Sequence, residues 1–142
     1  MTPEQDATGA SAPTIVNPAG IADPTPNGYS AVVIAPGGCR LAFVSGQSGH
    51  DESGRLSPDF AEQVAQTYAN LGTVLEALDA TPDRVVKLSV FVVDHDMAKL
   101  GVLTEAVTRM FGGTLPAQTL VPVPRLAVDG MLFEVEAVVA LR

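Results

Sequence analysis

The sequence predicts an α+β fold in which a mixed sheet of five to six strands carries two helices on one face. The chain of 142 residues is long enough for one hydrophobic core but short for two. Its residues are 46% hydrophobic but only 5% aromatic, so the core must rest on aliphatic side chains, which suit a sheet. Only two segments show the apolar period of an amphipathic helix, and two helices can cover just one face of such a sheet.

The amino-terminal part is expected to form an arm, residues 1–14, ahead of a single domain at residues 15–142. Residues 1 to about 28 contain five of the eleven prolines and show neither a helical nor a strand period. Residues 15–18 are expected to add a short edge strand. The next β-rich runs, 31–35 and 40–45, flank Pro36-Gly37-Gly38 and are predicted to form a β-hairpin.

A first helix is predicted after a Gly- and Ser-rich loop at residues 46–57. Ser57 is the expected N-cap, Pro58 lies in the first turn, and Pro82 ends the segment. The apolar residues at helical spacing are Phe60, Val64, Leu71, Leu75 and Leu78. A strand that is apolar on nearly both faces follows at 84–93. The strand, helix and strand are therefore expected to form a parallel pair joined by a right-handed crossover.

A second helix is predicted to begin near Asp94 or Asp96 and to end at Gly112-Gly113. Its apolar face comprises Leu100, Leu103, Val107 and either Met110 or Phe111. Two strands complete the chain, at about 117–123 and 131–140.

The last strand predicts how the sheet is covered, because side chains alternate between the two faces of a strand. The apolar set, which should meet the helices, is Met131, Phe133, Val135, Ala137 and Val139; the opposite set is Leu132, Glu134, Glu136 and Val138. With the alternate residues of strand 84–93, the opposite set would present Val and Leu side chains to water. Such a patch favours association, so the chain is predicted to associate with copies of itself.

Composition excludes several classes of partner. The 16 acidic residues outnumber the 8 basic ones, so nucleic acid and anionic membrane surfaces are not expected to bind. Cys39 is the only cysteine, and no cluster has the spacing of metal ligands, so neither a disulfide nor a metal or other cofactor is expected. The first residues lack a secretion signal, and no apolar run is long enough to span a bilayer. A cytoplasmic location is therefore expected.

Several short segments together resemble the Rid family of small trimeric proteins. They are Gly28-Tyr29-Ser30, Val44-Ser45-Gly46-Gln47, Ala69-Asn70-Leu71, residues 116–121 and residues 132–137. The resemblance covers roughly residues 15 to 142 and implies a chorismate-mutase-like fold. It also implies a homotrimer with small-molecule clefts between subunits and hydrolysis of reactive imines and enamines.

The resemblance implies roles for individual residues. Glu134 falls where the deaminating members hold a Glu that orients or activates the attacking water. Tyr29, Gln47, Gln118 and Thr119 are the implied substrate-binding residues. For Glu134 and for Tyr29, an ordinary structural role stays open beside the functional one.

Gln118 departs from the family pattern, because the deaminating members have an Arg at this position to hold the substrate carboxylate. A Gln amide carries no charge and cannot make the paired, charge-assisted hydrogen bonds of a guanidinium. Standard 2-imino acid deaminase activity is therefore expected to be weak or absent. Whether Arg40, Arg109 or Arg125 substitutes stays open.

Two functions remain for the site. The first is hydrolysis of C=N or enamine compounds other than the usual 2-imino acids; the second is a non-catalytic trimer that binds a metabolite or a protein. His50 is a lesser catalytic candidate, because a lone loop His is usually solvated. His95 is expected to be a surface residue near a helix start, and Cys39 has no base nearby in sequence to activate it.

Overall fold

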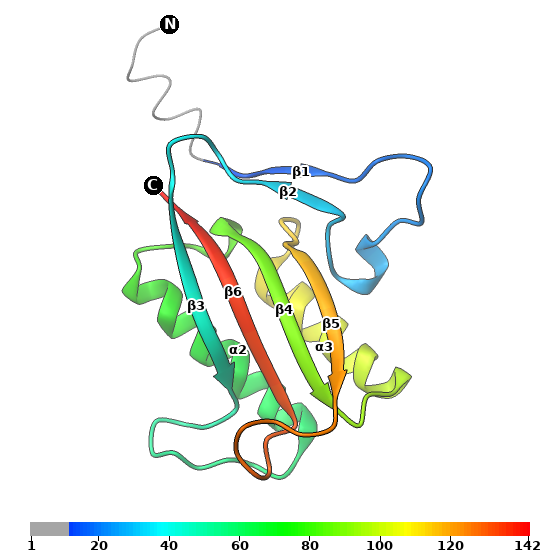
Figure 1. The fold of residues 1–142 in the computed structure, drawn as a ribbon, viewed down its shortest axis with the longest axis vertical. Coiled ribbons are helices and arrows are strands. Elements are labelled where there is room, and N and C mark those ends of the chain that lie inside the picture. The colour runs from blue at the N-terminus through cyan, green and yellow to red at the C-terminus, as the bar shows by residue number, and fades with distance from the viewer. Residues whose placement is uncertain (1–11) are drawn as a thin grey trace, which may run out of the picture.

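Two β-sheets and two α-helices make up the computed structural model, which describes residues 12–142 (Figure 1). The strands are β1 (Thr14–Val16), β2 (Val32–Ile34), β3 (Arg40–Ser48), β4 (Val85–Val93), β5 (Ala117–Val123) and β6 (Phe133–Leu141). The helices are α2 (Phe60–Ala77) and α3 (Met97–Phe111), with short 3-10 turns η1 (Thr25–Asn27) and η2 (Pro82–Arg84). Most of the expected arm, residues 1–11, lies outside the described residues.

The larger sheet has four strands in the order β3-β6-β4-β5, so the last strand of the chain lies inside it. β6 is antiparallel to both neighbours, whereas β4 and β5 are parallel. β3 and β4 therefore run in the same direction, but β6 separates them, and the parallel pair predicted from strand, helix and strand is not a pair of neighbours. β5 is an outer strand, and it contains Pro122.

The predicted hairpin between 31–35 and 40–45 is wrong. β2 pairs with β1 in a separate two-stranded antiparallel sheet, and β3 pairs with β6. Residues 36–39 do form a turn, closed by a Cys39 N–H to Pro36 carbonyl hydrogen bond of 3.4 Å. β2 runs across the end of the larger sheet, and the turn leads from it into β3 along the edge of that sheet (Figure 1). The strands are thus divided between two sheets rather than joined in one.

Both helices begin at an aspartate. Asp59 caps α2 by accepting a hydrogen bond from the Glu62 N–H, and Asp96 caps α3 by accepting one from the Lys99 N–H. The second helix was expected to begin near Asp94 or Asp96, and the structure places its cap at Asp96, whereas the N-cap predicted at Ser57 is wrong. The Ser57 hydroxyl instead accepts from the Asp59 N–H and donates to the Glu62 carboxylate, which supports the cap from outside the helix.

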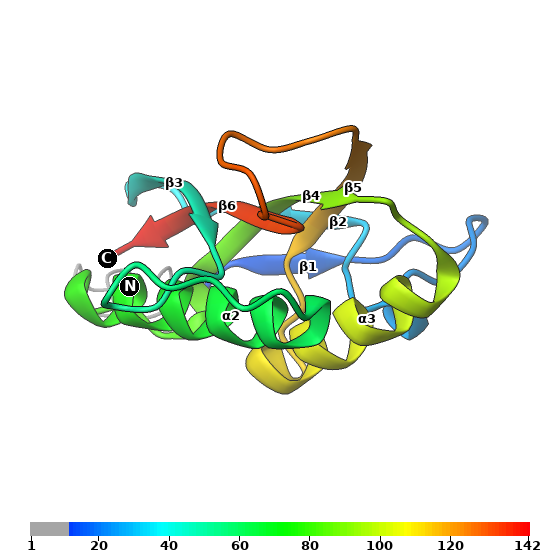
Figure 2. The same cartoon turned by 90° about the horizontal axis from the view of Figure 1, so that it is seen from below.

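The helices cover one face of the larger sheet, as predicted (Figure 2). The apolar set of β6 is buried against them, with Phe133, Val135 and Val139 at 0% exposure. The opposite face carries Glu134, Glu136 and large apolar side chains; Phe43 is 76% exposed and Leu41 47%. We call this uncovered side of the larger sheet the open face.

The segment leading into β2 is held against α3. Gly28 has φ 81°, and a Cβ at this position would lie 2.5 Å from the Val107 Cγ1 atom, so only glycine fits. The Ser30 N–H then donates to the Pro116 carbonyl, and Ser30 forms a parallel bridge with Ala117 at the start of β5. These contacts place Tyr29 beside β5.

Gln63 joins α2 to the connection between β5 and β6. Its side chain is fully buried; Nε2 donates to the carbonyls of Ser57 (2.7 Å) and Gly130 (2.9 Å), and Oε1 accepts from the Leu132 N–H (2.9 Å). Three backbone groups from two loops thus depend on a single amide, and they include the residue that leads into β6.

Replacing Gln63 by Leu is expected to lower the free energy of unfolding by about 3 kcal/mol, because buried backbone groups lose their partner. The matched control is Gln66→Leu, three residues further along α2, which removes only a side-chain bond to Asn70 and should cost less than about 1 kcal/mol. Urea denaturation of both variants measures the difference. Equal costs would contradict a bridging role for Gln63.

Candidate functional site

A cavity of about 470 Å³ lies between α3 and the outer strand β5. Three of the predicted substrate-binding residues, Tyr29, Gln118 and Thr119, line it. Its other lining residues are Asn27, Val90, Leu100, Leu103, Thr104 and Leu120, so the wall is largely apolar. We call this space the Gln118 cavity; it offers an amide and a phenol to a small ligand in apolar surroundings.

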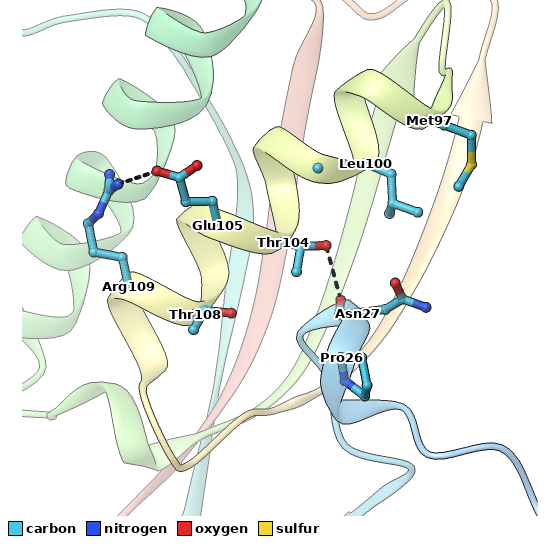
Figure 3. Close-up of a pocket in the computed structure, with 9 residues that line it drawn as sticks. Pro26, Asn27, Met97, Leu100, Thr104, Glu105, Thr108 and Arg109 are labelled. Atoms are coloured by element: carbon cyan, nitrogen blue, oxygen red, sulfur yellow. Dashed lines mark hydrogen bonds and ion pairs between the residues drawn. The ribbon is translucent and has the colours of Figure 1, made fainter.

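A second hollow, of about 620 Å³, adjoins the Gln118 cavity on the outer side of α3 (Figure 3). The two share Asn27, Leu100 and Thr104. The Thr104 hydroxyl donates to the Asn27 carbonyl at 3.5 Å and ties η1 to the helix where the two hollows meet.

None of the three candidate arginines lines the Gln118 cavity. Arg109 lies along the outer hollow, where its Nη2 is 2.7 Å from Glu105 Oε1, and Arg125 pairs with Asp129 at 2.6 Å. Both pairs are exposed. Arg40 is an exposed residue at the start of β3. Within one copy of the chain, no arginine takes the place expected of a guanidinium at Gln118.

Glu134 lies on the open face of β6, away from the Gln118 cavity. Its cross-strand partners are Phe91 on β4 and Ser48 on β3. The carboxylate lies over Gly46, where a Cβ would be 2.6 Å from the Glu134 Cδ atom and closer still to Oε2. Glycine at position 46 thus leaves the space that the Glu134 side chain fills, beside the bulge in β3 between Val44 and Gln47.

Glu136 and Gln47 lie in other surroundings than the Glu134 carboxylate. Glu136 lines a hollow of about 280 Å³ on the open face with Phe43, Lys87 and Ser89. Gln47 pairs in register with Val135, a residue on the helix side, and its Nε2 donates to the Ser45 carbonyl at 3.1 Å. Its amide thus braces the bulge in β3.

The loop after β3 is ordered by α2. The Asn70 Nδ2 donates to the carbonyls of both Ser48 and His50, each at 2.8 Å, and the Ser48 hydroxyl is 2.7 Å from His50 Nδ1. His50 is thus not a solvated loop residue but half of a partly buried serine and histidine pair. The sequence carried a signal for this pair: Ser48 and His50 are two residues apart, and side chains at that spacing on an extended segment lie on the same face.

Nearby charges are few. The Ser53 hydroxyl and the Arg55 N–H donate to Asp51 and lower the pKa of that carboxyl, so Asp51 is ionised at neutral pH.

His95 lies between β4 and α3, with its Nδ1 atom buried and unpartnered among the described residues. Within residues 12–142 no three His, Cys, Asp or Glu side chains gather as a metal site. No helix in that part of the chain is long and apolar enough to cross a membrane.

Comparisons with known proteins agree on one family. A family model described as endoribonuclease L-PSP matches residues 21–141. The RutC family protein UK114 of Drosophila melanogaster is 32% identical over 112 residues, which are 78% of this chain and 77% of that protein. The 2-iminobutanoate/2-iminopropanoate deaminase of Salmonella typhimurium is 32% identical over 104 residues, 72% of this chain and 80% of the deaminase.

Solved structures give the same result. The Rid family protein YyfB of Yersinia pestis superposes with a TM-score of 0.86 at 31% sequence identity, covering 92% of this chain and 99% of that one. RidA from an Antarctic Psychrobacter superposes with a TM-score of 0.66 at 26% identity, with 92% and 98% covered. The α+β architecture with two helices is thus shared with these structures.

Gly46→Ala is expected to displace the Glu134 carboxylate while lowering the free energy of unfolding by less than about 1 kcal/mol, because the added methyl meets the movable end of a side chain. Gly49→Ala is the contrasting variant: its Cβ would lie 2.8 Å from the Gln63 backbone, which cannot yield, and should cost about 2 kcal/mol. Urea denaturation ranks the two. Crystal structures of both variants show whether Glu134 moves only in Gly46→Ala.

Proposed function

Because the chain belongs to the Rid, or endoribonuclease L-PSP, family, we propose that it hydrolyses small imine- or enamine-type compounds in clefts between copies of itself. The observation that carries the proposal is the division of the candidate residues between two surfaces. Tyr29 and Gln118 line a cavity at the β5 edge, whereas Glu134 lies on the open face, as does the Thr119 hydroxyl, which accepts a hydrogen bond from Lys87 Nζ at 3.0 Å. One copy therefore presents two incomplete sites.

A second copy completes both. When the open face of one subunit packs against the β5 edge of its neighbour, Glu134 of one copy is brought to the Gln118 cavity of the other. A closed ring of three copies satisfies this head-to-tail contact with identical interfaces, as the family resemblance implies. The exposed Phe43 and Leu41 give the open face the apolar surface that such a contact buries.

Within such a cleft, one wall activates the water molecule and the other binds the substrate. The Glu134 carboxylate orients a water molecule and accepts its proton as the water attacks the carbon of a C=N group. Tyr29 and Gln118 hydrogen-bond the polar groups of the substrate, and the apolar residues around them exclude further water. An enamine is hydrolysed by the same groups after a proton adds to its carbon, because that protonation creates the C=N group that water attacks.

Gln118 sets the substrate class in this proposal. The loss of a charge-assisted contact to a carboxylate costs about 2 to 5 kcal/mol in a partly desolvated cleft. An amide instead suits a neutral group that both donates and accepts, such as an amide on the substrate. The preferred substrate is therefore an imine or enamine without a carboxylate beside the reacting carbon.

RNA is not the substrate in this proposal, although the matching family model carries the word endoribonuclease. The chain has a formal net charge of −8, which repels a phosphate backbone. The second candidate, a trimer that binds a metabolite or a protein without catalysis, is favoured by the same missing guanidinium, and the following experiment separates the two.

Ammonia release from 2-iminopropanoate and from bulkier 2-imino acids, generated in the assay by an amino acid oxidase, tests the proposal. We expect little or no activity from the unchanged protein and at least about 30-fold more from Gln118→Arg, because the guanidinium restores the carboxylate contact. Thr73→Arg, at an exposed position on α2 that does not line the cavity, adds the same charge and is the control. If Gln118→Arg released no ammonia from any of these imines, the non-catalytic function would be favoured.

Mixed assemblies test the division of the site. The unchanged protein lacks the guanidinium, and the double variant Gln118→Arg, Glu134→Ala lacks the carboxylate, so each alone should be inactive. Co-expression with two different affinity tags yields assemblies that contain both chains. Recovered imine hydrolysis in these would show that the two walls come from different copies. No recovery beside an active Gln118→Arg single variant would place the site within one copy.

The open face can be tested separately. Phe43→Ser should weaken self-association at least about tenfold, because an apolar ring leaves the interface. Ile34→Ser is the matched control, since Ile34 is 52% exposed but belongs to β2 in the smaller sheet. Sedimentation equilibrium measures both variants. An unchanged association constant for Phe43→Ser, or an equal loss for Ile34→Ser, would contradict the use of the open face.

A further inference from the structure

The Ser48 and His50 pair adjoins Glu134, and the contacts that create this arrangement come from three elements. Ser48 lies directly opposite Glu134 in the antiparallel pairing of β3 and β6. Side chains of such partners share a face, with Cβ atoms about 4.5 to 5.5 Å apart. The Ser48 hydroxyl is 2.7 Å from His50 Nδ1, and Asn70 on α2 holds both backbone carbonyls.

We propose that the Ser48 hydroxyl is a second proton-transferring group of the Glu134 site and that His50 supplies its proton. This inference rests on the proposed imine hydrolysis and adds residues to it. When the imidazole is protonated, both ring nitrogens are donors, so Nδ1–H donates to the Ser48 oxygen. The serine hydroxyl proton is then directed outward, on the face that carries the Glu134 carboxylate. His50 is thus a positioning residue, and Ser48 is the group that meets the substrate.

Each proton in the hydrolysis is then accounted for. As the water oxygen bonds to the imine carbon, Glu134 takes the water proton. The C=N electron pair moves to nitrogen, which takes the Ser48 proton, and His50 replaces that proton on Ser48. Glu134 then protonates the nitrogen as the C–N bond breaks and ammonia leaves. The proton of the new hydroxyl returns through Ser48 to His50 while the carbonyl forms, which restores the starting state.

The groups around His50 come from α2, from its own loop and from the sheet. On α2, the residues that contact the loop are the uncharged Asn70 and Gln63. Within the loop, the Asp51 carboxylate is held by Ser53 and by the Arg55 backbone, and the Arg55 side chain is exposed. From the sheet, β6 contributes Glu134 opposite Ser48.

The NMR signals of the histidine rings test this link without any substrate. The chain has two histidines, so His95 is an internal control; it lies beyond the end of β4 at Val93, past the turn at Asp94. We expect Glu134→Gln to change the ring chemical shifts of His50 and to leave those of His95 unchanged.

The same comparison in Ser48→Ala decides whether the hydroxyl carries the coupling. There, the effect of Glu134→Gln on His50 should shrink to less than half of its value in the unchanged chain. An effect of Glu134→Gln that is absent, or that persists in full without the Ser48 hydroxyl, would overturn the proposal.

Kinetics in the Gln118→Arg background supply the second readout. His50→Gln should lower kcat about 100-fold with little change in KM, and it should remove the loss of activity that rising pH causes near neutrality. An unchanged kcat and pH profile would refute the proton role. Inactivity of Gln118→Arg itself would refute the proposed hydrolysis, whereas the NMR comparison separately reports the link between Glu134 and His50.

Discussion

The burial of one side of β6 is the constraint on which the rest of the structure depends. β6 lies inside the larger sheet, and its alternate side chains Phe133, Val135 and Val139 are wholly withdrawn from water against both helices. Because neighbouring side chains of a strand point to opposite faces, the Glu134 side chain must point to the open face. A shift of β6 by one residue would bury that carboxylate and expose the core, so the packing of the core fixes the register that places Glu134 on the open face.

Much of this arrangement follows from local patterns in the sequence. The alternation in 131–139 predicted the buried and open sides of β6, and the apolar periods predicted both helices and the buried residues Leu71, Leu75 and Val107. The start of α3 was predicted near Asp94 or Asp96, and the structure places the cap at Asp96. These features depend on residues near one another in the chain, where periodicity and capping operate.

The predictions that were wrong concern contacts between residues far apart in the chain. Nothing near Gly37 and Gly38 shows that β2 pairs with β1, because the partner of an edge strand is chosen by tertiary packing rather than by its turn. The insertion of β6 between β3 and β4 is likewise invisible to local rules. The site shows the same limit: the sequence indicated Tyr29, Gln118 and Glu134 as separate candidates but could not place them on two different surfaces of one copy.

The outer strand β5 has a further consequence for how copies of this chain meet. A free sheet edge offers unpaired backbone groups that recruit strands from other molecules. Here the first residues of β5 are bonded by Ser30, and further along Pro122 has no N–H to offer. The addition of further strands to the sheet is therefore obstructed at this edge.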